Sequence, residues 1–554
     1  MPTRRELMLV VGGYVTGTAF GSKDLFALPV TDLVAPDTII QTNLVKPVRP
    51  VKGSVAIGMA GIADWGASQP FIDIMKQSRE WQGRSEKEWE SHSHQDLRAG
   101  GHLDAESWPV SIPSSANRVG TIILTQIAAD DTSLNGRYRV TWEGTGTLTV
   151  SGGQNLDQGV GWVEFDYTAT GESMVLVDVT ATPVRNIRCI NLKHRAAYEA
   201  GEIFRPEWLA LIENFRLFRF MDWQSTNNSP LSSWADRPKL SSATWSLGVP
   251  VEIMVALCNK AGVDGWFCFP HLATDDYIIR FAQYIQANLR DDLVAYYEYS
   301  NEVWNFQFEQ AHWANQQAEA LWPDHIGQDG WMQFYGGRSA EMAMLLDGVY
   351  AGTMGRHRKV ITTHTAWRGL EYGILDAPRW VAMQAGRKAP KDHFDCYAVT
   401  GYFGHGLSAE DGTAQIQTWR QQGEMLAFQQ MRAALEDEIT GLQGQWQYQK
   451  DAADAAGLSL VMYEGGSHIV PHHSTVDADA TLLPFLERFH YSEDMAALYT
   501  RAMTAFRDIG GEFFNVFVEV SGPGRHGFWG ARRHVMDENP RWTAVTMHNR
   551  VVPR

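Results

Sequence analysis

The sequence predicts a (β/α)8 TIM barrel that carries a β-sandwich domain between its first and second strands. Over most of the 554 residues, short apolar runs rich in β-branched and aromatic residues alternate with helix-like stretches, which is the pattern of repeated βα units. From about Pro109 to Cys189 this gives way to short alternating runs with Gly- and Asp-containing turns, which is typical of an antiparallel sandwich. A doubly wound open sheet is the alternative, but no Gly-rich phosphate loop supports it.

The predicted elements can be placed in chain order from periodicity and turn residues. The barrel strands are expected at 55–60, 217–223, 265–270, 293–302, 359–365, 394–404, 459–464 and 512–520. Helices are expected at 71–81, 207–214, 250–261, 275–289, about 306–321, 330–353, about 413–456 and 493–508. The insert shows strand-like runs at 137–142, 147–150, 160–167 and 173–179.

This order divides the chain into three predicted parts. Residues 1–50 form a signal-like segment and an extended lead-in, 51–84 with 196–554 form the barrel, and 105–192 form the insert. The insert could bind glycan or shape one wall of a cleft. The second role is favoured, because nothing in the segment specifies a ligand.

Composition limits the range of possible functions. The net charge of −17 argues against a nucleic-acid partner, since phosphate binding needs a basic patch. The 21 tryptophans and 18 tyrosines fit a protein that stacks sugar rings, although a large aromatic core is the plainer explanation. Cys189, Cys258, Cys268 and Cys396 lack zinc spacing and are predicted to be buried free thiols. No segment is apolar over the 18 or more residues of a membrane span, and nothing predicts an oligomeric state.

The N-terminus resembles a twin-arginine export signal. Arg4-Arg5 precedes a mildly apolar, Gly-containing run that extends to about Phe20. This predicts export to the periplasm or the medium, with a first strand of the mature fold as the alternative.

Two strand ends carry a glutamate. The run Tyr297-Glu298-Tyr299-Ser300-Asn301-Glu302-Val303-Trp304 passes from a predicted strand into a polar stretch, and Leu458 to Gly466 passes from another strand into Glu464. In a parallel barrel, functional groups gather where the strands end, so the two carboxylates are expected to face each other. Other polar and aromatic residues at such ends are Asp64, Trp65, Arg219, Asp222, Trp223, His271, His364, Trp367, Tyr402 and Trp529.

These residues resemble the clan A glycoside hydrolases, in the broad style of family 5 cellulases and mannanases. That group ends its fourth strand in Tyr-Glu-x-x-Asn-Glu-Pro, which Tyr297 to Glu302 follows. Its other strand-end residues are matched here by Arg219, Trp223, His271, Tyr402, Glu464 and Trp529. The resemblance covers roughly 52–80 and 200–535 and leaves the insert outside. Val303 stands in place of the Pro, the sequence around Glu464 differs, and the insertion is foreign to the family, so a distinct family within the clan is expected.

The resemblance implies retaining hydrolysis of β-glycosidic bonds in a polysaccharide or oligosaccharide, without a cofactor or metal. Glu302 would be the acid/base and Glu464 the nucleophile, with their carboxyl groups about 5–5.5 Å apart. Arg219 and Tyr402 would keep Glu464 ionised, and Asn301 would bind the sugar 2-hydroxyl. Trp529 would form the floor beneath the ring. Further substrate contacts are predicted at Trp65, Trp223, His271, His364 and Trp367, each of which could instead serve packing or core hydrogen bonding.

Plainer interpretations accompany these assignments. Glu302 could be a charge at a helix N-terminus and Glu464 a loop carboxylate beside a Gly-Gly turn. Glu298 is expected to be structural and paired with Arg219. His468, His472 and His473 are expected to form a solvated loop rather than a metal site. A non-catalytic glycan-binding protein and a cell-surface structural protein remain the alternative functions; no G-x-S-x-G motif supports serine hydrolase chemistry.

Overall fold

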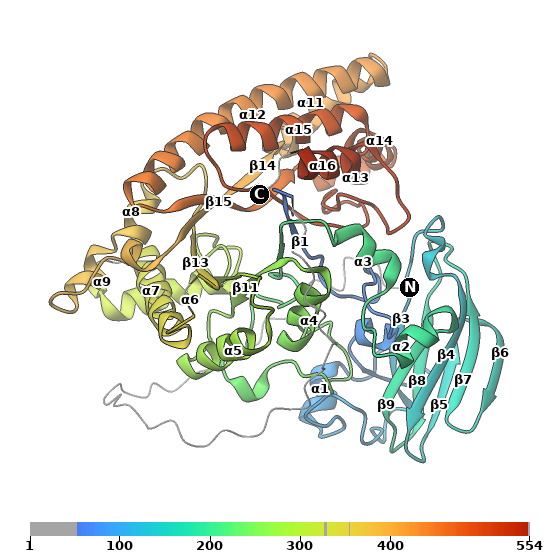
Figure 1. The fold of residues 1–554 in the computed structure, drawn as a ribbon. Helices are drawn as coiled ribbons and strands as arrows, with labels where there is room; N and C mark the ends of the chain where they lie inside the picture. Colours follow the sequence, from blue (N-terminus) through green and yellow to red (C-terminus); the bar gives the residue numbers. More distant parts are fainter. Residues whose placement is uncertain (1–52, 326–328, 354, 552–554) are drawn as a thin grey trace. The chain divides into compact units, whose positions relative to one another are not determined.

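The computed structural model describes residues 53–325, 329–353 and 355–551. The signal-like segment and lead-in predicted at 1–50 lie outside the described residues. Within these ranges, eight parallel strands close into a barrel in the order β1-β10-β11-β12-β13-β14-β15-β16, and β1 pairs with β16 to complete it (Figure 1). Their bounds are Ala56–Gly58, Leu217–Arg219, Asp264–Phe269, Ala295–Tyr299, His357–Thr362, Cys396–Phe403, Ser459–Ser467 and Asn515–Val516. The predicted fold class is confirmed.

Helices lie in the connections between the barrel strands and after the last of these strands. From α1 to α8 they are His94–Ala99, Arg195–Glu199, Pro206–Ile212, Val251–Ala261, Asp275–Asn288, Glu309–Leu321, Gly330–Val349 and Leu370–Leu375. From α9 to α16 they are Pro378–Ala382, His405–Ser408, Glu410–Arg420, Glu424–Ala455, His473–Ala478, Leu482–His490, Glu493–Asp508 and Pro540–Val551. The long helix predicted at about 413–456 is divided into α11 and α12 at Gly423, whose φ of 105° no helix can continue through. The helix predicted at 71–81 is a single 3-10 turn, Ile74–Gln77.

The barrel strands are buried on both faces, which explains why their sequences are nearly continuous apolar runs. Along β11, Trp266 and Cys268 belong to a cluster with other inward-facing strand residues. Phe267 and Phe269 face the other way and pack against Phe281 of α5, with ring centroids 6.0 and 5.4 Å away. Burying one such ring stabilises the fold by about 1.5–3 kcal/mol, so each barrel strand is held from both sides.

The insert consists of two four-stranded antiparallel sheets (Figure 1). The first has the order β2-β3-β8-β5, with bounds Gln82–Arg84, Arg118–Ile123, Val175–Ala181 and Thr147–Ser151. The second has the order β6-β7-β4-β9, with bounds Gln154–Gly159, Trp162–Tyr167, Gly136–Glu143 and Arg185–Asn191. Buried residues of both sheets, such as Val177 and Phe165, form one apolar cluster, which is the packing of a sandwich. The first sheet begins at β2, earlier than the insert start predicted at 105.

One loop of the insert is fastened to the barrel at the end of β1. Thr125, just after β3, donates its backbone N–H to the Asp64 carbonyl at 2.9 Å and its hydroxyl to the Asp64 carboxylate. Arg79 forms a two-point ion pair with the same carboxylate, at 3.1 and 2.9 Å. The insert therefore contacts the segment that follows β1.

In the described part of the chain, no helix combines the length and the apolar character that crossing a bilayer requires.

Candidate active site

The segment after β12 has an unusual backbone. Ser300 and Glu302 both adopt left-handed φ values, 63° and 42°, although neither is glycine. Such conformations cost free energy, and they persist at sites where the surrounding structure fixes them. They turn the chain sharply at the strand end, so that Asn301 is 2% exposed and enters the hydrogen-bond network of the barrel interior.

Arg219, at the end of β10, is the centre of that network. Its Nη1 donates to Glu464 Oε1 at 2.6 Å, and its Nη2 donates to Glu298 Oε2 at 2.8 Å and to Asn301 Oδ1 at 2.8 Å. The guanidinium lies 5.2 Å from the ring centroid of Tyr463. A planar fork can contact several acceptors at once, which an ammonium cannot do. One buried cation thus connects residues from the second, fourth and seventh barrel strands.

Glu464 lies on β15 and is almost fully buried. Besides the Arg219 ion pair, its Oε2 accepts a hydrogen bond from the Tyr402 hydroxyl at 2.9 Å. Burial raises the pKa of Glu464 above its ordinary value, while the charge of Arg219 and the Tyr402 hydrogen bond act against that rise. Both partners favour the ionised carboxylate.

Glu302 has different partners. Its Oε1 accepts from the Tyr463 hydroxyl at 3.2 Å and its Oε2 from Asn305 Nδ2 at 3.0 Å. Burial and then the negative charge of Glu464 raise the pKa of Glu302 to about 8. With no direct cation among these contacts, the carboxyl group holds its proton at neutral pH. The two glutamates are therefore close enough to influence each other, and Glu464, unlike Glu302, has a direct ion pair with Arg219.

Glu298 lies one layer deeper in the barrel. It is fully buried, and its Oε2 accepts from Arg219 and from Trp266 Nε1, at 2.8 and 2.9 Å. This confirms the prediction of a structural carboxylate paired with Arg219.

Tyr463 is a site residue that the sequence did not indicate. The pairing of β14 with β15 steps from Val399–Met462 to Thr400–Glu464, which leaves Tyr463 as the extra residue of a β-bulge. Strict alternation would place Tyr463 and Glu464 on opposite faces of the sheet. The bulge lets both side chains reach the barrel interior.

Aromatic rings surround Tyr402 at one side of the site. Trp529 is 5.8 Å from the Tyr402 ring centroid, and Phe517, just after β16, is 6.3 Å from Tyr402 and 5.9 Å from Trp529. His468 lies 5.1 Å from Trp529. Trp529 thus lies beside the tyrosine that contacts Glu464, and Phe517 is a neighbour that the sequence pattern did not indicate.

Two of the predicted substrate contacts, Trp223 and His271, are packed inside the fold. Trp223 is 1% exposed and stacks on Trp208 with centroids 6.0 Å apart, so it offers no face to a sugar and belongs to the core. His271 is 5% exposed and packs edge-on against Trp313 of α6, at 5.4 Å. Burial lowers the pKa of His271 to about 4, which keeps it neutral. Sequence alone could not separate a strand-end aromatic that is packed in the core from one that is exposed.

Three others lie at the surface of the barrel. Trp65 and Trp367 are each 47% exposed, Trp65 over Arg79 and Trp367 beside Trp331. His364 is half-buried, 4.4 Å from the Trp304 ring, and the Trp304 indole N–H donates to Tyr463 at 3.3 Å. His364 therefore reaches the Glu302 network through one intervening ring.

His468 does not behave as the predicted solvated loop residue. Its ring lies between Trp529 and His405, 5.1 and 4.0 Å away, and burial lowers its pKa to about 4. His472 and His473 are exposed, as predicted. Across the described ranges, no three or more His, Cys, Asp or Glu side chains are grouped to hold a metal ion. The four cysteines are free and buried, as predicted.

Asp222 adds a further carboxylate near the pair. It follows β10, and its pKa is raised to about 7 by burial and then by the charge of Glu464. Its side chain adjoins the chain at Gly61, where an added Cβ would lie 3.7 Å from the Asp222 Cβ.

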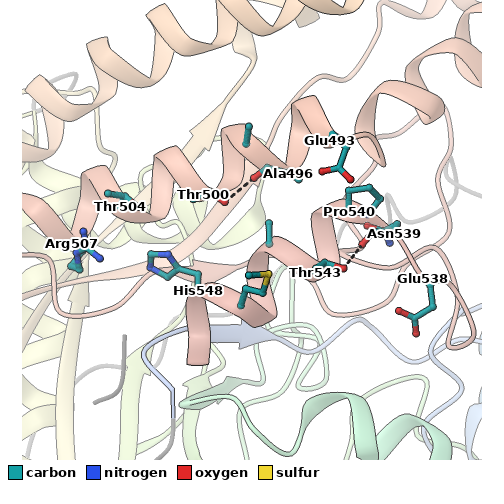
Figure 2. A pocket seen from close by; sticks show the side chains of 13 residues that line it. Glu493, Ala496, Thr500, Thr504, Arg507, Glu538, Asn539, Pro540, Thr543 and His548 are labelled. Atoms are coloured by element: carbon teal, nitrogen blue, oxygen red, sulfur yellow. Dashed lines mark hydrogen bonds between the residues drawn. The ribbon is translucent and has the colours of Figure 1, made fainter. Parts of the chain in front are cut away.

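A separate groove of about 770 Å³ lies between α15 and α16 (Figure 2). Glu493, Arg507, Glu538 and His548 are its charged or titratable residues. None of the residues of the carboxylate site lines it.

Comparisons with known proteins give matches among solved structures alone. No family model matches the chain, and no curated protein matches its sequence. An α-L-arabinofuranosidase from Thermotoga maritima matches at 11% identity and a TM-score of 0.36, over 62% of this chain and 63% of that one. The Cel5A protein of Thermotoga maritima, solved with mannotriose, matches at 9% identity and a TM-score of 0.33, over 62% of this chain and 91% of that one. A family 5 xyloglucanase from Paenibacillus pabuli matches at 10% identity and a TM-score of 0.35, over 62% of this chain and 90% of that one.

Proposed function

We propose that this protein is a retaining glycoside hydrolase that cleaves β-glycosidic bonds in a polysaccharide or oligosaccharide. The observation that supports it best is the asymmetry of the two glutamates within one network. Glu464 contacts a buried cation and a hydroxyl donor, whereas Glu302 contacts only neutral donors and has a pKa of about 8. A pair of carboxyl groups whose surroundings separate their protonation states is the arrangement that acid and nucleophile roles require.

In the first half-reaction, the Glu464 carboxylate attacks the anomeric carbon and the bond to the leaving oxygen breaks. Glu302 transfers its proton to that oxygen, so the leaving sugar departs as a neutral alcohol and a glycosyl ester remains on Glu464. In the second half, ionised Glu302 removes a proton from water, whose oxygen attacks the same carbon and releases Glu464. This double displacement requires carboxyl groups about 5–5.5 Å apart.

The neighbouring residues have supporting roles in this proposal. Arg219 and Tyr402 stabilise Glu464 as an anion before attack and as a leaving group afterwards. Asn301 uses its Oδ1 for Arg219 and its Nδ2 for Asn227, at 2.8 and 3.0 Å, which fixes the amide for contact with the sugar 2-hydroxyl. Trp529 provides an aromatic wall beside Tyr402.

Hydrolysis of a panel of aryl β-glycosides and of plant and microbial polysaccharides tests the reaction. Glu302→Gln and Glu464→Gln are each expected to lower kcat by about 10³-fold or more, because neither amide can perform acid/base or nucleophilic chemistry. Glu309→Gln, an exposed glutamate at the start of α6, is the control and should retain activity. Full activity in both site variants contradicts the assignment. Glycan binding without cleavage by the wild type would favour the non-catalytic alternative.

Added azide separates the two roles. In Glu302→Ala, azide should attack the glycosyl ester and give a glycosyl azide with retained configuration. In Glu464→Ala, azide should occupy the vacated side and give the inverted product. NMR of the product anomers distinguishes them, and the opposite pattern would exchange the roles of the two glutamates.

A further inference from the structure

Three aromatic side chains from separate segments form a continuous row, which we call the aromatic ledge: Phe306, Trp331 and Trp367. Phe306 lies between β12 and α6, Trp331 in the first turn of α7, and Trp367 after β13. The ring centroids of Phe306 and Trp331 are 5.5 Å apart, and those of Trp331 and Trp367 are 5.9 Å apart. Phe306 is 44% and Trp367 47% exposed, whereas Trp331 is 8% exposed and supports both. The ledge thus has two exposed rings on a buried one.

The ledge is joined to Glu302 through a short, well-bonded loop. Asn305, which donates to Glu302, precedes Phe306 directly, and its side-chain oxygen accepts from the Gln307 N–H at 3.0 Å. His312 Nε2 lies 3.0 Å from the Phe306 carbonyl, and the two rings are 5.3 Å apart. The position of the Phe306 ring is therefore fixed relative to the carboxyl group of Glu302.

The acid role of Glu302 indicates which part of the substrate lies near the ledge. A general acid must be within hydrogen-bond reach of the leaving oxygen, so the leaving part of the substrate lies toward Glu302. The ledge follows β12 and β13, whereas Tyr402 and Phe517 follow β14 and β16. The ledge therefore lies on the side of the acid, where the leaving group is expected, and the second aromatic group lies beside the nucleophile.

We propose that the aromatic ledge binds the sugars on the leaving-group side of a β-linked oligosaccharide or polysaccharide by stacking against their rings. This inference rests on the proposed function, since the acid role of Glu302 sets the direction. The half-exposed rings of Phe306 and Trp367, tilted by 56° and 53° to the Trp331 ring, offer separate stacking faces to a chain of sugars, whereas a small leaving group would need no such extended surface. The substrate expected here therefore has sugar units on the leaving side of the cleaved bond.

The test compares substrates that do and do not reach the ledge. Cellohexaose, mannohexaose and xylohexaose extend across the site, whereas β-glycosyl fluorides of the same sugars leave as fluoride and cannot touch it. Phe306→Ala and Trp367→Ala should each lower kcat/KM on the cleaved hexaose by about tenfold, because each removes one stacking ring. Activity on the fluoride should stay within about twofold. Trp89→Ala removes a tryptophan of similar exposure, 45%, from the insert and should change neither activity.

A binding measurement makes the proposal independent of cleavage. Calorimetric titration of Glu302→Gln with the same hexaoses should show weaker binding when Phe306→Ala or Trp367→Ala is added. The proposal for the ledge is overturned if Phe306→Ala and Trp367→Ala lose equal activity on the hexaose and the fluoride. It is also overturned if they bind the hexaose as tightly as the parent protein does. Hydrolysis of the fluoride with no binding or cleavage of any hexaose also overturns it and leaves the proposed reaction standing. Hexaose binding that depends on the ledge, with no hydrolysis of any substrate, supports the ledge and overturns the proposed reaction. If the protein neither binds a hexaose nor hydrolyses any substrate, both the ledge and the proposed reaction are rejected.

Discussion

Tyr463 and Glu464 are neighbours in the chain, yet both face the barrel interior. The Tyr463 hydroxyl donates to Glu302 Oε1 at 3.2 Å, while Glu464 Oε1 accepts from Arg219 at 2.6 Å. The bulge at Tyr463 makes this possible, because it adds a residue where the pairing steps from Met462 to Glu464. One strand thus supplies the proposed nucleophile and a hydrogen-bond donor to the proposed acid.

Removing the Tyr463 hydroxyl should shift the basic limb of the pH profile upward. The hydrogen bond from Tyr463 lowers the pKa of Glu302, which stands at about 8 because burial and the Glu464 charge raise it more. The proposed acid must be protonated, so kcat/KM of the wild type should fall as pH rises through about 8. In Tyr463→Phe the fall should move to higher pH, with a loss of up to about tenfold at the optimum. A limb that moves to lower pH would contradict this.

Tyr402→Phe should shift the acidic limb of the pH profile to higher pH. The Tyr402 hydrogen bond favours ionised Glu464, so its loss raises the pKa of that carboxyl group. The nucleophile must be ionised, and the rise of kcat/KM with pH should therefore begin at higher pH than in the wild type. The pH profiles of both tyrosine variants, measured together, check whether each limb responds separately. A shift of the same limb in both would show that the two roles are not divided in this way.

Glu302→Gln should be more stable than the wild type in alkaline solution. Glu302 has a folded pKa of about 8 against an ordinary value of 4.5, so the folded state binds its proton more tightly than the unfolded chain. The stabilising contribution is complete below the ordinary pKa and is lost as pH rises through the folded pKa. Urea unfolding should show the variant gaining up to a few kcal/mol over the wild type between about pH 5 and pH 9. A stability difference that stays constant with pH would refute the raised pKa.

Arg219→Lys should destabilise the fold although it keeps the charge. A lysine cannot span Glu464, Glu298 and Asn301 as the guanidinium does, so one buried carboxylate loses its partner. The expected loss is about 3–5 kcal/mol in the free energy of unfolding, with a large fall in kcat. Arg195→Lys is the control, because the Arg195–Glu199 pair is solvent-exposed and should contribute little. Equal stability of the two variants would contradict the central role of Arg219.

Several structural features could be predicted because they depend on short stretches of chain. The largely apolar and aromatic run from Leu293 to Tyr299 predicts a barrel strand at 293–302, and the structure has this strand at Ala295–Tyr299. Glu298 lies four residues before Glu302, and its burial against Arg219 followed from that spacing. Helix α15 matches its predicted bounds, since Ser492 caps it and the apolar spacing is regular.

Features that depend on long-range packing could not be predicted. Trp223 and Trp367 both follow barrel strands, yet one stacks in the core and the other is 47% exposed. Their difference arises from the neighbours that the fold brings to each ring, which local sequence does not specify. The same holds for Phe517 and His468, whose contacts with Trp529 join segments from different strand ends.

Alternation and turn residues are local properties of the chain, and they predict the barrel, the insert and two glutamates near the ends of the fourth and seventh strands. The contacts that join Arg219 to Glu464, Glu298 and Asn301, and Tyr463 to Glu302, depend on the folded chain. A single bulge changes the face of the sheet on which a residue lies, and closure of the barrel then sets which side chains meet.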